Sequence, residues 1–206
     1  VTYNSAGWIG VQYRAMMTSL EPCSTYYYQV GSKSNEKMSD VYHFNTYCPS
    51  QPITFAVIAD MGFGNNSDST IKQLTDLVDQ NKIHGVIHSG DIGYADGYQA
   101  HWDTFLNKIQ PITTRIPYMV TPGNHEFWFN FKAYKTRFYM PSVGSNVDIG
   151  DSSEKEGSGD NMYYSWSYGP AHFVAMNSET AIDTQDFHKD NLKFVEADMA
   201  AVDRTQ

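Results

Sequence analysis

The sequence predicts an all-β segment followed by an α/β domain built on a parallel sheet. Residues 1–50 contain alternating or aromatic-rich runs and no helical period. From residue 53 onward, short apolar runs alternate with segments whose apolar residues have helical spacing. This alternation indicates strand–helix–strand crossovers and therefore a largely parallel, buried sheet.

Composition excludes several classes of protein. The net charge of −9 and the lack of a Lys/Arg cluster argue against a general nucleic-acid binder. No apolar run approaches the roughly 18 residues that a membrane span requires. Charged residues make up 18% and aromatic residues 15% of the chain, which excludes intrinsic disorder. Because the overall field repels anions, a bound phosphate would need a local positive centre.

The all-β segment is expected to be the last part of a β-sandwich of the immunoglobulin or fibronectin kind. A complete sandwich takes about 100 residues, twice what residues 1–50 provide. The expected strands cover residues 8–15, 26–30 and 41–46. Two prolines shortly after them, Pro49 and Pro52, predict a domain boundary near residue 50.

The two cysteines bracket the last two of these strands. If residue 30 pairs with 41 and residue 26 with 45, Cys23 and Cys48 face each other at the open end of the hairpin. That register predicts a disulfide, provided that the compartment is oxidising. Two unpaired thiols are the alternative.

The second segment carries the elements of a crossover fold. Asp68 is a candidate cap for its first helix, and residues 142–160, which lack any period, are expected to form a loop. The expected strands are 53–59, 85–88, 117–120, 163–168 and 171–176, and the expected helices are 69–80, 98–109, 131–139 and 187–202.

Polar side chains follow three of these strands. Asp60, Asp91 and Asn124 come after the first, second and third strand, and carboxyl ends of parallel strands meet at one edge. Each residue alone could be a helix cap or turn residue, but three in order favour a site. Two carboxylates, an amide and the Tyr94 phenol suit hard cations. Metal pairs that cleave phosphoesters commonly share one carboxylate, and Asp91 is the candidate for this bridge.

Three blocks of sequence resemble a known family. Asp60-x-Gly62, Gly90-Asp91-x-x-Tyr94 and Gly123-Asn124-His125-Glu126 are similar to the first three of five blocks of the purple acid phosphatases, within the metallophosphoesterase superfamily. Residues 20–31 resemble the fibronectin-like domain that precedes the catalytic domain in larger members. The resemblance implies the C-terminal part of a fibronectin type III-like domain over residues 1–50. It implies the N-terminal half of an α/β metallophosphoesterase sandwich over residues 51–206.

The resemblance also implies a role for each block. Asp60 and Tyr94 would bind Fe(III), and Asp91 would bridge it to a divalent zinc, manganese or iron ion held by Asn124. His125 would lie beside the substrate phosphate as a hydrogen-bond or proton donor. The implied activity is hydrolysis of phosphate monoesters at acid pH by a metal-bound hydroxide. A phosphodiesterase or nucleotide hydrolase of the same superfamily and a truncated, non-catalytic paralogue are alternatives.

The sequence departs from the family in one respect. The last two blocks, Val-x-x-His and Gly-His-x-His, supply three His ligands and do not occur here. We therefore expect a fragment, and negligible phosphatase activity from these residues alone. The remaining histidines match no ligand block and are expected on the surface or in packing; they are His43, His84, His88, His101, His172 and His188.

A glycosylation signal and the cysteines bear on the cellular location of the protein. Asn65-Asn66-Ser67 is a sequon, so Asn65 would be a glycosylation site in a secreted protein. Bulk at Asn65 would lie close to Asp60, and an ordinary surface asparagine is the alternative. The expectation is a secreted, lysosomal or vacuolar protein whose partner is a phosphate monoester.

Overall fold

The computed structural model describes residues 2–5, 8–32, 37–141, 158, 160–179, 185–202 and 204. A parallel three-stranded sheet lies at the centre, in the strand order β7-β8-β9. Its strands are β7 (Phe55–Ile58), β8 (Gly85–Ser89) and β9 (Tyr118–Thr121). Val57 pairs with Ile87, and Ile87 pairs with Met119, so all three strands end at one edge. The predicted crossover arrangement is confirmed.

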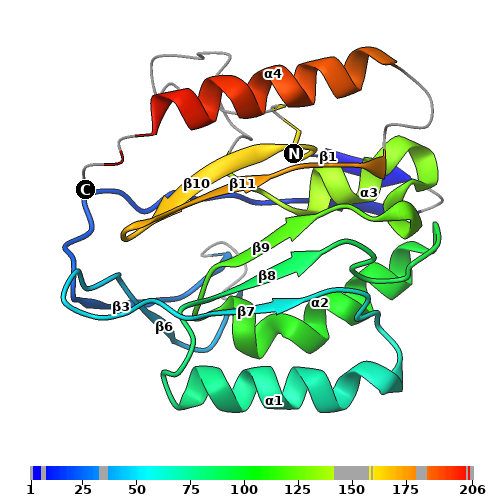
Figure 1. Ribbon diagram of the computed structural model, residues 1–206. Coiled ribbons are helices and arrows are strands. Elements are labelled where there is room, and N and C mark those ends of the chain that lie inside the picture. The colour runs from blue at the N-terminus through cyan, green and yellow to red at the C-terminus, as the bar shows by residue number, and fades with distance from the viewer. Residues whose placement is uncertain are drawn as a thin grey trace.

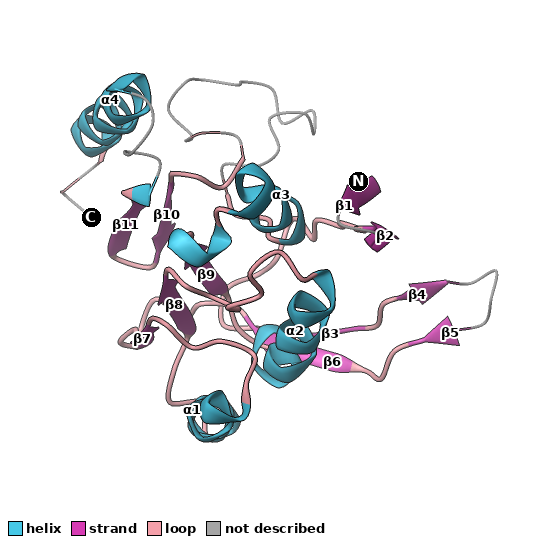
Figure 2. Ribbon diagram, turned by 90° about the vertical axis from the view of Figure 1, so that its right-hand side faces the viewer, coloured by secondary structure: helices cyan, strands magenta, loops and turns pink. Residues whose placement is uncertain are grey.

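Two layers cover this sheet (Figures 1 and 2). Helices α1 (Asp68–Asp79) and α2 (Gln99–Thr113) lie on one face. The antiparallel hairpin of β10 (Tyr164–Tyr168) and β11 (Ala171–Ala175) lies on the other face, with α4 (Gln185–Ala201) beyond it. The expected loop over residues 142–160 falls almost entirely outside the described residues.

The helices bury the apolar stripes that their spacing predicts. In α1, Ile71, Leu74 and Val78 are buried against the sheet. The predicted cap of α1 was wrong: Ser67 is the N-cap, and Asp68 begins the helix and pairs with Lys108 at 2.6 Å. Helix α2 continues past its predicted end through Pro111, because the fully buried Ile112 extends its apolar face and offsets one lost backbone bond.

Three antiparallel strand pairs make up the described N-terminal region. The predicted strand over residues 8–15 is shorter than expected. It ends at Val11 and pairs with a strand that the sequence analysis missed. The pairs are β1 (Thr2–Ser5) with β2 (Trp8–Val11), β3 (Thr25–Tyr28) with β6 (Tyr42–Asn45), and β4 (Gly31–Ser32) with β5 (Lys37–Met38).

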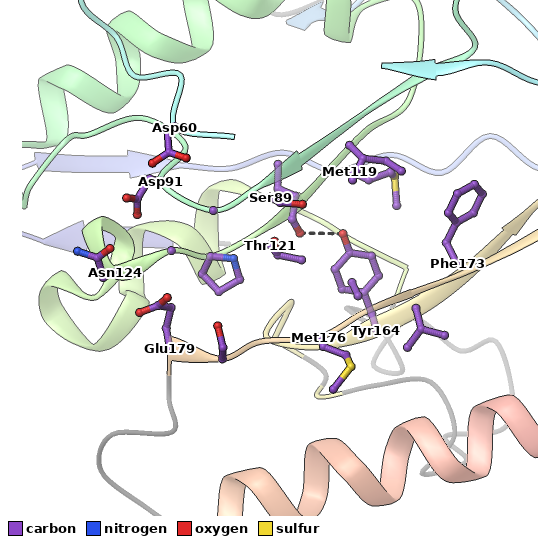
Figure 3. A pocket seen from close by; sticks show the side chains of 18 of the residues that line it. Asp60, Ser89, Asp91, Met119, Thr121, Asn124, Tyr164, Phe173, Met176 and Glu179 are labelled. Atoms are coloured by element: carbon purple, nitrogen blue, oxygen red, sulfur yellow. Dashed lines mark hydrogen bonds between the residues drawn. The ribbon is translucent and has the colours of Figure 1, made fainter. Parts of the chain in front are cut away.

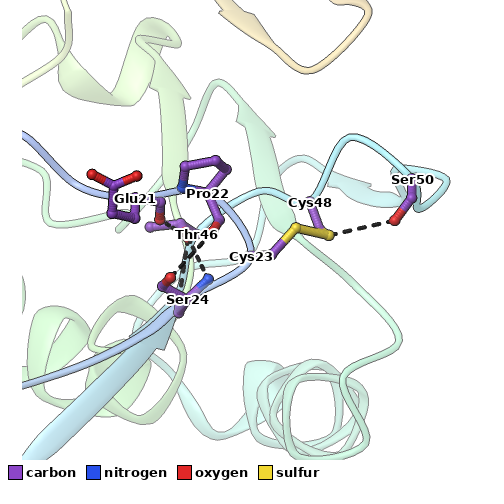
Figure 4. Close-up of a disulfide and its surroundings, with 7 residues drawn as sticks. All are labelled: Glu21, Pro22, Cys23, Ser24, Thr46, Cys48 and Ser50. Atoms are coloured by element: carbon purple, nitrogen blue, oxygen red, sulfur yellow. Dashed lines mark hydrogen bonds between the residues drawn. A yellow bond between two sulfur atoms is a disulfide. The ribbon is translucent and has the colours of Figure 1, made fainter.

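The disulfide Cys23–Cys48 is present, although the register predicted for its hairpin was off by one residue. Thr25, not Tyr26, pairs with Asn45. Thr46 fixes this register, because its amide donates to the Ser24 carbonyl and its hydroxyl accepts from the Ser24 amide. Cys23 then takes a left-handed conformation (φ 54°), and this turn brings its sulfur to Cys48 (Figure 4).

The N-terminal region is attached to the α/β region through Trp8. The Trp8 indole donates to Asp103 of α2 at 3.0 Å, and the Arg137 guanidinium lies 4.5 Å from the centre of the indole ring. Arg137 also pairs with Asp103 at 2.7 Å, and its side chain is 1% exposed. This cluster joins β2, α2 and the end of α3 (Trp128–Arg137).

No helix among the described residues combines the length and hydrophobicity needed to cross a membrane.

His88 is a packing histidine, as expected. It lies in β8 with an exposure of 0%, and its Nδ1 is 2.8 Å from the Tyr118 hydroxyl. Its Nε2 has no hydrogen-bond partner in the part of the chain that the structure describes. Burial lowers the pKa of His88 to about 4, and the nearby Asp60 carboxylate only partly opposes this.

We predict that His88 makes folding sensitive to acid. Its pKa is lower in the folded state than the roughly 6.5 of an exposed imidazole, so its contribution to stability is present above pH 6.5 and is lost as pH falls toward 4. His88→Asn keeps an acceptor near Tyr118 and removes the titration. Between pH 7 and pH 5 the variant should lose about 2 kcal/mol less unfolding free energy than the unmodified chain. Urea unfolding measures this, with His43→Asn on β6 as the control. Parallel pH profiles for His88→Asn and the unmodified chain would contradict the assignment.

Candidate metal centre

The three sequence blocks meet at the carboxyl edge of the parallel sheet, as the sequence predicts. Asp60 follows β7, Asp91 follows β8, and Asn124 follows β9 in a single 3₁₀ turn, η3 (Asn124–Glu126). Figure 3 shows their side chains on neighbouring loops at one end of a cavity. Figure 2 looks onto this edge from the side to which the strands point.

Backbone bonds hold these loops together. The Asp60 amide donates to the Gly90 carbonyl at 3.3 Å, and the Gly62 amide donates to the Ile92 carbonyl at 3.0 Å. Asp60 and Asp91 both have left-handed backbones, with φ of 54° and 47°. Such strain costs roughly 1–2 kcal/mol per residue and is often retained at functional sites.

Gly123 is required by a close approach to the second block. A Cβ atom at this position would overlap the amide and carboxylate of Asp91. The carboxylate of Asp91 therefore lies directly against the backbone of the third block. Any side chain at residue 123 would push the second and third blocks apart.

Tyr94 links the two carboxylates. Its hydroxyl is 2.8 Å from Asp60 Oδ1 and 3.3 Å from Asp91 Oδ2. Desolvation and the bonds to these carboxylates raise the pKa of the phenol above its usual value. A hard cation among the three oxygens would reverse this effect, because its charge favours the phenolate. The donor set therefore fits a hard cation.

No group of three His, Cys, Asp or Glu side chains able to hold a metal occurs within the described residues. A metal at this edge would therefore depend on the Tyr94 and Asn124 oxygens in addition to the two carboxylates. All of these candidate ligand atoms are oxygens, which favours hard ions over soft ions that prefer thiolate ligands.

His125 is held by Asp96, a residue that the sequence analysis missed. His125 Nδ1 lies 2.6 Å from Asp96 Oδ1, and its amide donates to Asp91 Oδ1 at 3.1 Å. The His125 ring also packs against Tyr94, with ring centres 4.3 Å apart. The bond to Asp96 raises the pKa of His125, which favours the protonated imidazolium. The sequence feature that could have pointed to Asp96 is its position, two residues after the ligand candidate Tyr94.

The buried side chain of Glu126 joins the second and third blocks. Its side-chain oxygens accept from the Gly123 amide at 2.8 Å and from the Ile92 amide at 3.0 Å. The residue is 2% exposed. Burial raises the pKa of Glu126 to about 7, although hydrogen bonds from the backbone amides of Gly123, Ile92 and Gly93 oppose the shift. In the sequence, Glu126 is the last residue of the third block, but no pattern there assigns it a role.

A cavity of about 450 Å³ adjoins the site, between the parallel sheet and the β10–β11 hairpin. Asp60, Asp91 and Asn124 line its polar end (Figure 3). Met119 and Phe173 line its apolar part, and Glu179, after β11, also lines the cavity. No sequence pattern pointed to Glu179.

The sequon lies on the turn η2 (Asn65–Ser67), between β7 and α1. Asn65 is exposed, whereas Ser67 is 2% exposed and its hydroxyl donates to the Gly64 carbonyl at 2.6 Å. Glycosylation of Asn65 stays a prediction.

Comparison with known proteins identifies the family of this site. The family model described as calcineurin-like phosphoesterase matches residues 53–198. The chain belongs to the calcineurin-like phosphoesterase family. The model of the purple acid phosphatase N-terminal domain matches residues 1–46, so the resemblance to purple acid phosphatases is confirmed. The all-β segment followed by an α/β domain is confirmed as well.

Individual relatives agree with this assignment. Purple acid phosphatase 18 of Arabidopsis thaliana is 32% identical over 95% of this chain and 41% of its own length. Acid phosphatase type 7 of Danio rerio is 31% identical over 81% of this chain and 34% of its own length. The solved purple acid phosphatase PPD1 of yellow lupin has a TM-score of 0.67 and 27% identity, over 90% of this chain and 35% of that one. The chain thus spans less than half the length of these relatives.

We predict that Glu126 is needed to keep the second and third blocks together. Glu126→Gln should destabilise folding by about 1–3 kcal/mol, because the new amide group faces a buried backbone N–H and leaves it without an acceptor. Urea unfolding measures the loss. Glu196→Gln, the same change at an exposed position on α4, should shift stability by less than about 0.5 kcal/mol. Equal stabilities for the two variants would refute this role.

Proposed function

We propose that the chain provides part of the active site of an acid phosphatase that hydrolyses phosphate monoesters at an Fe(III)–M(II) pair. The observation that carries this proposal is the Tyr94 hydroxyl within hydrogen-bonding distance of both Asp60 and Asp91. Three oxygens of three ligand candidates from two different blocks thus converge on one point. The similarity to purple acid phosphatases supports the same conclusion.

The four ligand candidates would bind two different metal ions. Asp60 and Tyr94 would hold Fe(III), Asp91 would contact both ions, and Asn124 would hold zinc, manganese or iron as the divalent ion. When bound, such a pair lowers the pKa of a coordinated water and neutralises charge on the phosphate. The net charge of the chain is −9, so this local positive charge is what would admit an anionic substrate.

His125 and Asp96 would act on the substrate side. Asp96 occupies Nδ1 of His125, so the imidazole has one fixed orientation and Nε2 remains for the phosphate. An imidazolium in this position donates a hydrogen bond to a phosphate oxygen or a proton to the leaving oxygen. The raised pKa of His125 keeps it protonated in mildly acidic solution, which suits a donor.

We further propose that residues 1–50 are the end of a fibronectin type III-like domain and that residues 51–206 belong to the catalytic domain. The all-β character of the described N-terminal region and the Trp8 contacts to α2 support two packed units. The Cys23–Cys48 disulfide supports a secreted, lysosomal or vacuolar location, because such bonds persist in oxidising compartments.

We predict that Asp91→Asn removes most of the activity. The test uses the complete gene product that contains this chain, supplied with iron and zinc, and p-nitrophenyl phosphate at acid pH. Because Asp91 would contact both ions, the variant should lose at least about 100-fold in kcat. Asp68→Asn, which alters an exposed ion pair with Lys108, is the matched control and should retain activity.

Two outcomes would contradict the proposal. Undiminished turnover by Asp91→Asn would show that the bridging ligand is misassigned. Faster hydrolysis of the bis-p-nitrophenyl ester than of the monoester would indicate a phosphodiesterase of the same superfamily.

A further inference from the structure

The cavity beside the candidate metal centre is lined by acidic side chains without basic ones. Among the described residues that line it, Asp60, Asp91 and Glu179 are acidic, and none is Lys, Arg or His. The metal ions of the proposed function would neutralise Asp60 and Asp91, which are ligand candidates. Glu179 belongs to none of the three blocks, so the negative charge of its carboxylate is not assigned to a metal. Such a carboxylate repels other anions in the cavity and attracts cations.

Buried contacts hold the backbone of Glu179 in place. Its amide donates to the Asn177 side chain at 2.8 Å, and Asn191 of α4 donates to the Asn177 carbonyl at 2.9 Å. Both asparagines are buried. No hydrogen bond or ion pair joins the Glu179 carboxylate to another residue in the described part of the chain. The carboxylate is therefore available to a ligand in the cavity.

Aromatic rings form the wall of the cavity on the side of the hairpin. Trp166 of β10 and Phe173 of β11 pair across the hairpin, and their rings stack with centres 4.8 Å apart. The Tyr164 ring lies 5.4 Å from that of Trp166, and its hydroxyl donates to the Val120 carbonyl at 2.7 Å. All three rings line the cavity, and Figure 3 shows two of them. Aromatic faces attract cations, so this wall also favours a positive group over a negative one.

The cavity has room for more than a phosphate. Its volume of about 450 Å³ lies within the range of small-molecule sites, roughly 300–1,000 Å³. A phosphate held by Asp60, Asp91 and Asn124 would occupy only the polar end. The rest of an ester could then extend through the same cavity that Glu179 and the aromatic wall line.

We propose that this cavity binds phosphate monoesters whose leaving group carries an ammonium group, with Glu179 as the specificity-determining residue. This inference rests on the proposed phosphatase function. The metal-centre residues would hold the phosphate end, and Glu179 would accept charge-assisted hydrogen bonds from the ammonium group. Monoesters of short amino alcohols carry these two charges a few bonds apart. Leaving groups that carry a carboxylate or a further phosphate would be disfavoured, because Glu179 repels them.

Three phosphonates that cannot be hydrolysed test this proposal. Aminoethylphosphonate, propylphosphonate and phosphonopropionate carry a cationic, a neutral and an anionic group at a similar distance from phosphorus. Each is titrated by calorimetry into the complete gene product that contains this chain, loaded with iron and zinc. Aminoethylphosphonate should bind about five- to thirtyfold more tightly than propylphosphonate, as expected for one charge-assisted contact. Phosphonopropionate should bind more weakly than propylphosphonate.

Glu179→Gln should remove this ranking, because the amide keeps the size of the side chain without its charge. The affinities for aminoethylphosphonate and propylphosphonate should then lie within about threefold of each other. Glu196→Gln, the same change at an exposed position on α4, is the matched control and should keep the ranking. Affinity for propylphosphonate should change by less than about threefold in both variants, which also shows that both are folded.

The outcomes separate this inference from the function on which it rests. Equal binding of the three compounds by the unmodified protein, or a ranking that survives Glu179→Gln, would overturn the role of Glu179 and leave the phosphatase proposal standing. If Glu179→Gln weakens all three compounds equally and lowers the metal content, Glu179 is a metal ligand and the specificity proposal is wrong. Binding of none of them by the unmodified protein would overturn both proposals.

Discussion

The placement of the Asp91 carboxylate is the constraint on which the candidate site depends. Asp91 lies against the Gly123 backbone, accepts from the His125 amide and contacts the Tyr94 hydroxyl, so one side chain ties the second block to the third. The left-handed backbone of Asp91 and the glycine at 123 both serve this contact. Glu126 reinforces the contact between the second and third blocks, because its carboxylate accepts hydrogen bonds from the Ile92 and Gly123 amides. The parallel sheet brings the three blocks to one edge, and these short contacts align their side chains.

The convergence of the three blocks and the buried face of α1 could be predicted, because both follow from the spacing of residues in the sequence. Parallel strands end at one edge, so the positions of Asp60, Asp91 and Asn124 after three successive strands were sufficient to bring them together. The stripe of Ile71, Leu74 and Val78 likewise determined which face of α1 is buried.

The features that were missed depend on particular side-chain contacts. The hairpin register is one residue away from the simple pairing because the Thr46 hydroxyl and amide both bind Ser24, and spacing alone does not reveal this. Asp96 has no periodic or motif signal of its own and acquires a role only when His125 comes within 2.6 Å. The irregular start of α3 is similar, because Phe131 fills the core while Trp128 and Phe129 remain outside. Tertiary packing decides such choices and overrides local propensity.

Tyr94 and the two carboxylates are proposed to form a site for Fe(III), and the visible absorption of the iron-loaded protein reports directly on the phenolate ligand. The complete gene product is loaded with Fe(III), and its visible absorption is compared with that of Tyr94→Phe and of Tyr98→Phe, a nearby exposed tyrosine. A phenolate-to-iron charge-transfer band is expected in the unmodified protein and in Tyr98→Phe, and it should be lost in Tyr94→Phe. A band of undiminished intensity in Tyr94→Phe would show that Tyr94 does not bind the iron.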